Sequence, residues 1–293
     1  MQKTLDLSIK KHEHGTTDGG YVTANKKIYP AYMDNQAWEA FVADMMEHHN
    51  DAYREYGAGS GGELKEKGSY PPKMASYGSS SRMIYNISKE IPDFVFEKKL
   101  PTTVGGTANL DGYLEKTGTH IFVEAKCREP YGHKAEQTIK QNYRGIYAWL
   151  REKMPRVFSC VMENMDNNEM QVAFFCRNKI VAHFDIKQMI CHMLGIATEL
   201  LKNPDEKSIL FLYLFYNPKG LPLGGDAACE IQTIYADTCW AAEHYRFEEM
   251  FGHVVDYLVQ EKGIAADEQT VTHLKNAFRF ELCDQDAYGD YLK

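Results

Sequence analysis

The stretch that decides the fold runs Ala108-Asn-Leu-Asp-Gly-Tyr-Leu-Glu-Lys-Thr-Gly-Thr-His-Ile-Phe-Val-Glu-Ala-Lys126. Its two halves, 108–115 and 120–126, are rich in apolar residues, and Lys116-Thr-Gly118 between them is a turn signal. An antiparallel hairpin is therefore predicted. A further strand candidate over 93–100 precedes it, so the pattern as a whole predicts a three-stranded antiparallel meander.

Three charged side chains of this meander can converge. Side chains alternate between the two faces of a strand, so Glu124 and Lys126 point the same way and Ala125 points into the opposite layer. Pairing around the turn can bring Asp111 alongside Glu124. Two carboxylates suit a hard divalent cation such as Mg²⁺, which prefers oxygen ligands and keeps several waters. Such an ion could lower the pKa of a bound water and neutralise charge on a phosphate, while Lys126 orients the water or stabilises the developing charge.

The meander is expected to lie between two helices. Serines at 79–81 can cap a helix that Pro92 ends, and apolar spacing over 133–153 predicts a long helix after the last strand. The order is therefore helix, three strands, helix. The other expected elements are an N-terminal arm over 1–30, a helix over 36–56, strands over 157–162, 170–176, 209–216 and 277–282, a helix over 185–201, and two helices within 227–261 joined near Gly252.

This order, with Asp111 on one strand and Glu124-x-Lys126 on the next, resembles the PD-(D/E)XK nuclease superfamily and in particular its restriction endonuclease-like members. The resemblance spans residues 79–153. It implies an α/β core with a mixed central β-sheet flanked by helices, and a metal-dependent phosphodiesterase. In that enzyme Asp111, Glu124 and the backbone carbonyl of Ala125 would bind Mg²⁺, with Mn²⁺ as a substitute, and Lys126 would assist the attacking water.

Accessory residues of the family have only partial counterparts here. Many members carry an acidic residue on the first helix, but 80–86 has none, so Glu90 or Glu97 would have to substitute. Whether one or two metal ions bind stays open. Some relatives also carry a glutamine on the helix after the motif, for which Gln137 and Gln141 are both candidates and Gln141 is favoured.

Basic residues gather around the end of the meander. The segment 124–156 holds eight Lys or Arg against four Glu, in a chain whose formal net charge is −8. Phosphate contacts come from such local stripes. The alternative is that these residues form an ordinary solvated helix surface. For Arg82, which precedes the meander, the alternative is an ion pair with Glu90. The candidate nucleic-acid-binding residues are Lys134, Lys140, Arg144 and Arg82.

Composition restricts the class of protein. With 44% hydrophobic and 25% charged residues, the 293-residue chain is globular and not disordered or collagen-like. The longest strongly apolar run, 209–216, is far shorter than the roughly 20 residues of a membrane helix, and residues 1–4 do not have the pattern of a secretory signal, so export is not expected. Seven scattered cysteines signal neither a disulfide framework nor a zinc ribbon, so a cytoplasmic protein is expected. A zinc site at Cys176, His183, Cys191 and His192 is disfavoured by its spacing.

Tyrosine is frequent, with 19 in the chain, and a cluster of four flanks a glycine-rich segment near residue 60. These are Tyr53, Tyr56, Tyr70 and Tyr77. Exposed aromatic rings can stack on bases, but most tyrosines pack with a solvated hydroxyl, so this cluster is expected to belong to the core.

These features predict one elaborated domain: an N-terminal arm and helix over 1–69, an endonuclease-like α/β core over 70–220, and a helical extension over 221–293 packed on the core. The expected function is Mg²⁺-dependent hydrolysis of DNA phosphodiesters, most simply by a restriction-type enzyme. A homodimer is expected if each protomer cuts one strand. Alternatives are a repair or mobile-element nuclease of the same superfamily, a non-catalytic nucleic-acid-binding module that retains the fold, and a scaffold that binds partners through its C-terminal helices.

Overall fold

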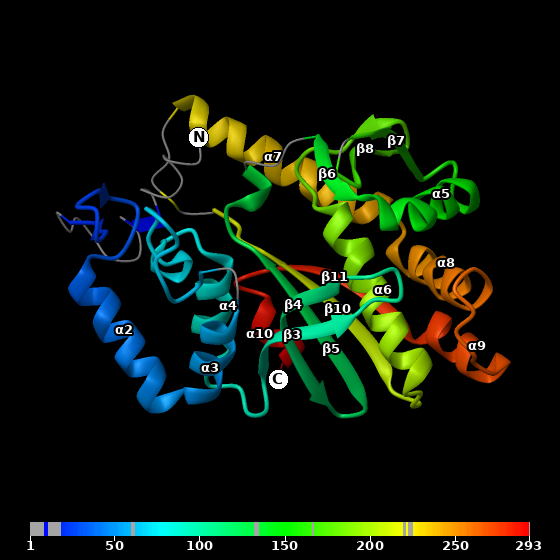
Figure 1. Cartoon of the computed structure of the whole chain (residues 1–293), viewed down its shortest axis with the longest axis horizontal. Coiled ribbons are helices and arrows are strands. Elements are labelled where there is room, and N and C mark those ends of the chain that lie inside the picture. Colours follow the sequence, from blue (N-terminus) through cyan, green and yellow to red (C-terminus); the bar gives the residue numbers. More distant parts are fainter. Residues whose placement is uncertain are drawn as a thin grey trace.

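A five-stranded mixed β-sheet runs through the centre of the protein, with helices on both sides (Figure 1). The computed structural model describes residues 9–10, 19–59, 62–131, 135–165, 167–218, 221 and 225–292. The strands, in spatial order, are β11 (Phe278–Asp284), β10 (Ser208–Phe215), β5 (Thr119–Lys126), β4 (Thr107–Lys116) and β3 (Val95–Pro101). The last three form the predicted antiparallel meander, and β10 runs parallel to both β5 and β11.

Strand β5 is buried on both faces, which explains its nearly continuous apolar sequence. Ile121, Val123 and Ala125 belong to a small apolar cluster shared with α4 (Ser80–Ser88) and α10 (Tyr288–Leu292). Phe122 instead joins the main core, to which α6 (Ile186–Lys202) and α8 (Phe247–Gln260) contribute. The sheet is therefore the middle layer between two helical layers.

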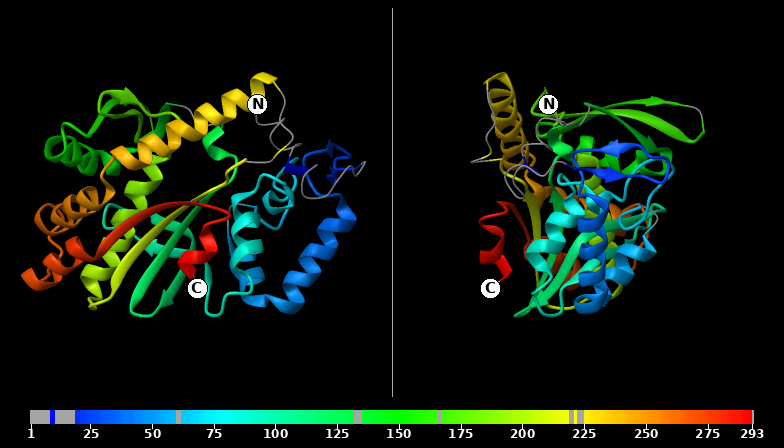
Figure 2. Two further views of the ribbon diagram at one scale, coloured as in Figure 1. Left: turned by 180° about the vertical axis from the view of Figure 1, so that it is seen from behind. Right: turned by 90° about the vertical axis from the view of Figure 1, so that its left-hand side faces the viewer.

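A long insertion separates β5 from α6. It contains a second, antiparallel sheet, and Figure 2 (right) shows its β7–β8 hairpin extending away from the central sheet. The helix predicted over 133–153 is correct over 144–153, but residues 136–140 pair with β8 instead and bury Ile139 opposite Met170. Strand pairing here overrides the local helical spacing. The elements are η2 (Glu129–Tyr131), β6 (Glu136–Lys140), η3 (Gln141–Tyr143), α5 (Arg144–Lys153), β7 (Phe158–Asn164), β8 (Glu169–Cys176) and β9 (Lys179–Ile180).

The N-terminal part gathers on one side of the sheet in Figures 1 and 2. The single helix predicted over 36–56 is two helices, since the backbone leaves the helical conformation at His49. The first helix begins where the Asp34 carboxylate accepts the Ala37 N–H. The elements are β1 (Tyr21–Val22), β2 (Ile28–Tyr29), α2 (Asn35–His48), α3 (Asn50–Ala58) and η1 (Lys73–Ala75).

The C-terminal part contributes both helices and the edge strand β11. The prediction that its two helices join near Gly252 is wrong. Helices α7 (Gly225–His244) and α8 join at Arg246, which adopts a left-handed conformation with φ 54°. The Arg246 guanidinium lies 2.8 Å from the Glu249 carboxylate. Helix α9 (Glu268–Ala277) lies within the predicted helical extension and leads into β11. Among the described residues no helix is long and apolar enough to cross a membrane.

Helix α6 approaches the sheet closely at Gly195. A Cβ at this position would lie 2.6 Å from Ala108 Cβ and 3.0 Å from Leu100 Cβ. We expect Gly195→Ala to destabilise the fold by about 1–3 kcal/mol through overpacking. Gly252→Ala is the matched control, because only Lys275 Cγ would lie near, at 3.6 Å, and a helix-interior Gly→Ala change stabilises by about 1 kcal/mol. Urea unfolding measures both, and equal shifts of the two midpoints would contradict the close contact.

Candidate active site

The three residues predicted to form the site do come together. The pairing of β4 with β5 ends at Gly112 and Val123, and beyond that point the Asp111 carboxylate accepts the Ala125 N–H, with Oδ2 at 2.7 Å. On β5, Lys126 Nζ lies 2.5 Å from Glu124 Oε1. A carboxylate at the end of one strand is thus fixed beside a carboxylate–ammonium pair on the next.

Helix α6 completes this cluster with two residues that the sequence did not identify as a pair. His192 Nε2 lies 2.8 Å from Glu124 Oε2, and Lys126 Nζ donates to Gln188 Oε1 at 2.5 Å. Gln188 and His192 are four residues apart, so they share one helix face. The N-cap of the same helix, Asp185, accepts the Gln188 N–H and sets where the helix begins.

The electrostatic environment shifts the pKa values of Asp111 and Glu124 in opposite directions. Burial, followed by the charge of Glu124, raises the pKa of Asp111 well above its ordinary value. Burial also opposes ionisation of Glu124, but Lys126 and His192 outweigh it and hold the pKa of Glu124 below its ordinary value. Burial disfavours the Lys126 ammonium as well, yet Glu124 raises the pKa of Lys126 well above its usual range. Glu124 and Lys126 therefore form a charged, buried pair.

These groups open into a cleft of about 370 Å³. Five carboxyl groups and three lysines line it, so acidic side chains outnumber basic ones. Its lining residues are Gly59, Glu63, Lys73, Ser80, Ser81, Glu97, Lys99, Asn109, Asp111, Glu124, Lys126, Glu129 and Gln188.

Glu97 is part of this cleft, as the sequence suggested for an accessory acid. Burial and the neighbouring Glu63 raise the pKa of Glu97 to about 7. Glu63 is a cleft residue that the sequence missed, because it lies in the segment that composition marks as a loop. Its Oε1 pairs with Lys73 at 3.3 Å, while its buried Oε2 has no hydrogen-bond partner in the structure.

The other predicted residues lie elsewhere. Gln141 donates from Nε2 to the Glu169 carbonyl at 3.2 Å and is outside the cleft, so Gln188 is the glutamine of this site. Lys140 is exposed on β6, and Arg144 bonds Asn164 at 2.6 Å on the inserted sheet. Arg82 is only 2% exposed and donates to the Tyr77 carbonyl, so the prediction that it contacts phosphate is wrong. Lys134 lies outside the described residues.

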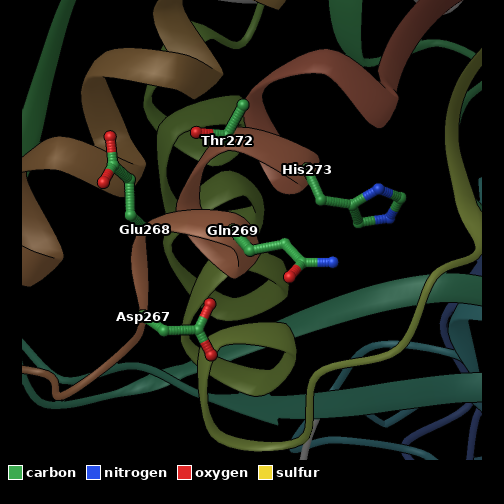
Figure 3. A pocket seen from close by; sticks show the side chains of 5 residues that line it. All are labelled: Asp267, Glu268, Gln269, Thr272 and His273. Atoms are coloured by element: carbon green, nitrogen blue, oxygen red, sulfur yellow. The ribbon is translucent and has the colours of Figure 1, made fainter.

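A larger hollow of about 750 Å³ lies over α9 (Figure 3). Two of its polar side chains make structural hydrogen bonds. Asp267 accepts the Thr270 N–H at the start of α9, and His273 is hydrogen-bonded to the Lys207 carbonyl. Two polar neighbours of this hollow are thus already used structurally. The cleft of the β4–β5 carboxylates, in contrast, brings charged groups from four parts of the chain together.

Comparison with models of protein families, with curated proteins and with solved structures finds no match to this chain. Within the described ranges, no three His, Cys, Asp or Glu side chains are arranged so as to hold a metal ion. The functional conclusion therefore depends on the chemistry of the cleft.

Proposed function

We propose that this protein is a metal-dependent endonuclease that hydrolyses DNA phosphodiesters, of the PD-(D/E)XK, restriction endonuclease-like type. The observation that carries the proposal is the convergence of Asp111, Glu124 and Lys126 in one cleft in which acidic side chains outnumber basic ones. The surrounding order of α4, β3, β4 and β5, followed on the sheet by α6 and β10, supports it as a fold able to hold these residues.

The residues present fit a hard divalent cation such as Mg²⁺. Burial, followed by the charges of neighbouring carboxylates, raises the pKa values of Asp111 and Glu97, and Glu63 has a buried oxygen without a hydrogen-bond partner. A divalent cation would favour the ionised form of these carboxyl groups and offset that cost. Asp111, Glu124 and the Ala125 carbonyl would hold the ion, with waters as the remaining ligands. When bound, the ion supplies an acidified water and neutralises phosphate charge.

Lys126 would act as a cation and not as a base. Its pKa is raised, so its ammonium stays protonated at neutral pH. The ammonium has three N–H donors. Glu124 and Gln188 accept two of them, which fixes the direction of the third. An ammonium so fixed orients a water molecule or stabilises charge on the phosphate as it grows. Lys73 and Lys99 on the cleft wall would bind the flanking phosphates.

A cleavage assay tests the proposal. Purified protein is incubated with a mixed pool of plasmid and phage DNA in Mg²⁺ or in EDTA, and the products are separated by gel electrophoresis. We expect cleavage in Mg²⁺ or Mn²⁺ and none in EDTA. Discrete fragments would indicate a restriction-type enzyme, and fragments of every size a nonspecific or repair nuclease. No cleavage in either metal, with intact DNA binding, would contradict catalysis and favour a binding module.

A further inference from the structure

The loop 62–73 joins the cleft to the protein surface. Its ends lie together, because Lys73 N–H donates to the Gly62 carbonyl at 2.9 Å and Met74 N–H donates to the Glu63 carbonyl at 3.0 Å. It is therefore a compact closed loop. Glu63 and Lys73 at its base line the cleft, so the two ends of the loop are fixed at the candidate active site.

The tip of this loop presents Tyr70. Of the tyrosines expected in the core, Tyr56 and Tyr77 are buried, but Tyr70 is 63% exposed, so the prediction is wrong for this residue. Its backbone is nonetheless fixed: Lys67 and Tyr70 exchange backbone hydrogen bonds at 3.1 and 3.2 Å, and Tyr29 Oη donates to the Ser69 carbonyl at 2.7 Å. An exposed aromatic ring on a rigid turn has little conformational entropy to lose on binding.

The surroundings of Tyr70 are basic. Residues 21–29 and 62–73 together hold five lysines and two glutamates, in a chain of net charge −8. Lys27 Nζ lies 4.9 Å from the centre of the Tyr29 ring and 5.8 Å from that of Tyr70. Glu63 and Lys73 both line the cleft, which leaves four lysines and one glutamate in these two segments. Lysines set beside an exposed aromatic face match a nucleic acid strand, whose phosphates are anionic and whose bases have π-faces.

We infer that Tyr70, with Lys27 beside it, is a stacking site for an unpaired base of a DNA strand bound by this protein. The inference deepens the proposed function, on which it depends for the identity of the substrate. An unpaired base is required because bases within a duplex already stack on their neighbours and offer no free face. The site therefore favours substrates that contain a single-stranded segment.

The test measures binding without cleavage, using the full chain in EDTA. The probe is a fluorescein-labelled single-stranded oligonucleotide, and a second copy carries 2-aminopurine, whose fluorescence falls when it stacks. We expect Tyr70→Ala to weaken binding about tenfold and to abolish the 2-aminopurine quenching. Tyr70→Trp should keep both, and Lys27→Ala should reduce the salt slope of log K by about one phosphate contact. Ile180→Ala, which alters a 49%-exposed side chain on β9, is the control and should bind like wild type.

Two results would overturn the inference. One is an unchanged affinity and unchanged quenching in Tyr70→Ala. The other is an equal loss for single-stranded DNA, fully paired duplex and heparin, which would indicate attraction of anions without stacking. If the stacking signal depends on Tyr70 but no DNA is cut in Mg²⁺, the inference holds and the proposed catalysis fails, so the two failures are distinguishable.

Discussion

Asp111→Asn is expected to remove Mg²⁺-dependent cleavage, by roughly a factor of 100 or more, and at the same time to stabilise the metal-free protein. Asparagine can still accept the Ala125 N–H, so the local geometry is retained. The asparagine side chain is uncharged, however, so it cannot provide the negative carboxylate ligand that would bind a divalent cation at this site. The same charge opposes folding of the metal-free protein, since burial and Glu124 raise the pKa of Asp111 in the folded state.

The sign of the pH dependence follows from that shift. A carboxyl group whose pKa is higher in the folded than in the unfolded state costs stability as the pH rises from its ordinary range toward the folded value. Asp111→Asn should therefore melt at a higher temperature than wild type at neutral pH, by roughly 2–4 °C for each kcal/mol relieved, and the difference should vanish at low pH. Mg²⁺ should raise the melting temperature of wild type only.

Differential scanning fluorimetry with and without Mg²⁺ measures these effects. Asp226→Asn, which neutralises an exposed carboxylate on α7, is the matched control and should change neither cleavage nor the Mg²⁺ response. A Mg²⁺ shift that persists in Asp111→Asn would place the cation elsewhere. Full cleavage by Asp111→Asn would contradict the role of this residue.

The part of the site that the sequence revealed is the part formed by near neighbours. Asp111 and Glu124 lie on strands joined by a tight turn, so alternation and turn position are enough to bring them together. The burial of both faces of β5 could likewise be predicted from its continuous apolar run. Register and pairing over such short separations follow from local pattern alone.

What the sequence did not reveal comes from distant segments. Gln188 and His192 contact Lys126 and Glu124, but the segment that forms the inserted sheet separates the two pairs in the sequence. The sequence predicted a helix directly after β5, whereas the helix that packs on the central sheet is α6. Glu63 was missed for the same reason, since nothing local distinguishes a loop glutamate that lines a cleft. Arg82 had the right charge, but burial beside Tyr77 depends on packing that composition does not contain.

Lys126→Met is expected to remove cleavage and also to destabilise the fold, by about 3–5 kcal/mol, because it leaves Glu124 buried without its closest counter-charge. His192 remains at 2.8 Å from Glu124, so the loss should fall toward the lower end of that range. Without Lys126 the pKa of Glu124 should rise in the folded state, so the destabilisation should grow as the pH increases. Urea unfolding at several pH values measures it.

A double variant tests whether the unpaired Glu124 carboxylate causes the loss of stability in Lys126→Met. In Lys126→Met with Glu124→Gln no unpaired carboxylate is buried, so we expect much of the lost stability to return while cleavage stays absent. Lys202→Met, an exposed lysine at the end of α6, is the matched control and should leave both properties near wild type. Since buried ion pairs can often be replaced by uncharged residues without loss of stability, a stable but inactive double variant would mean that this pair is retained for its chemistry. Persistent cleavage in Lys126→Met would contradict that conclusion, because no other described lysine lies within ion-pair distance of Glu124.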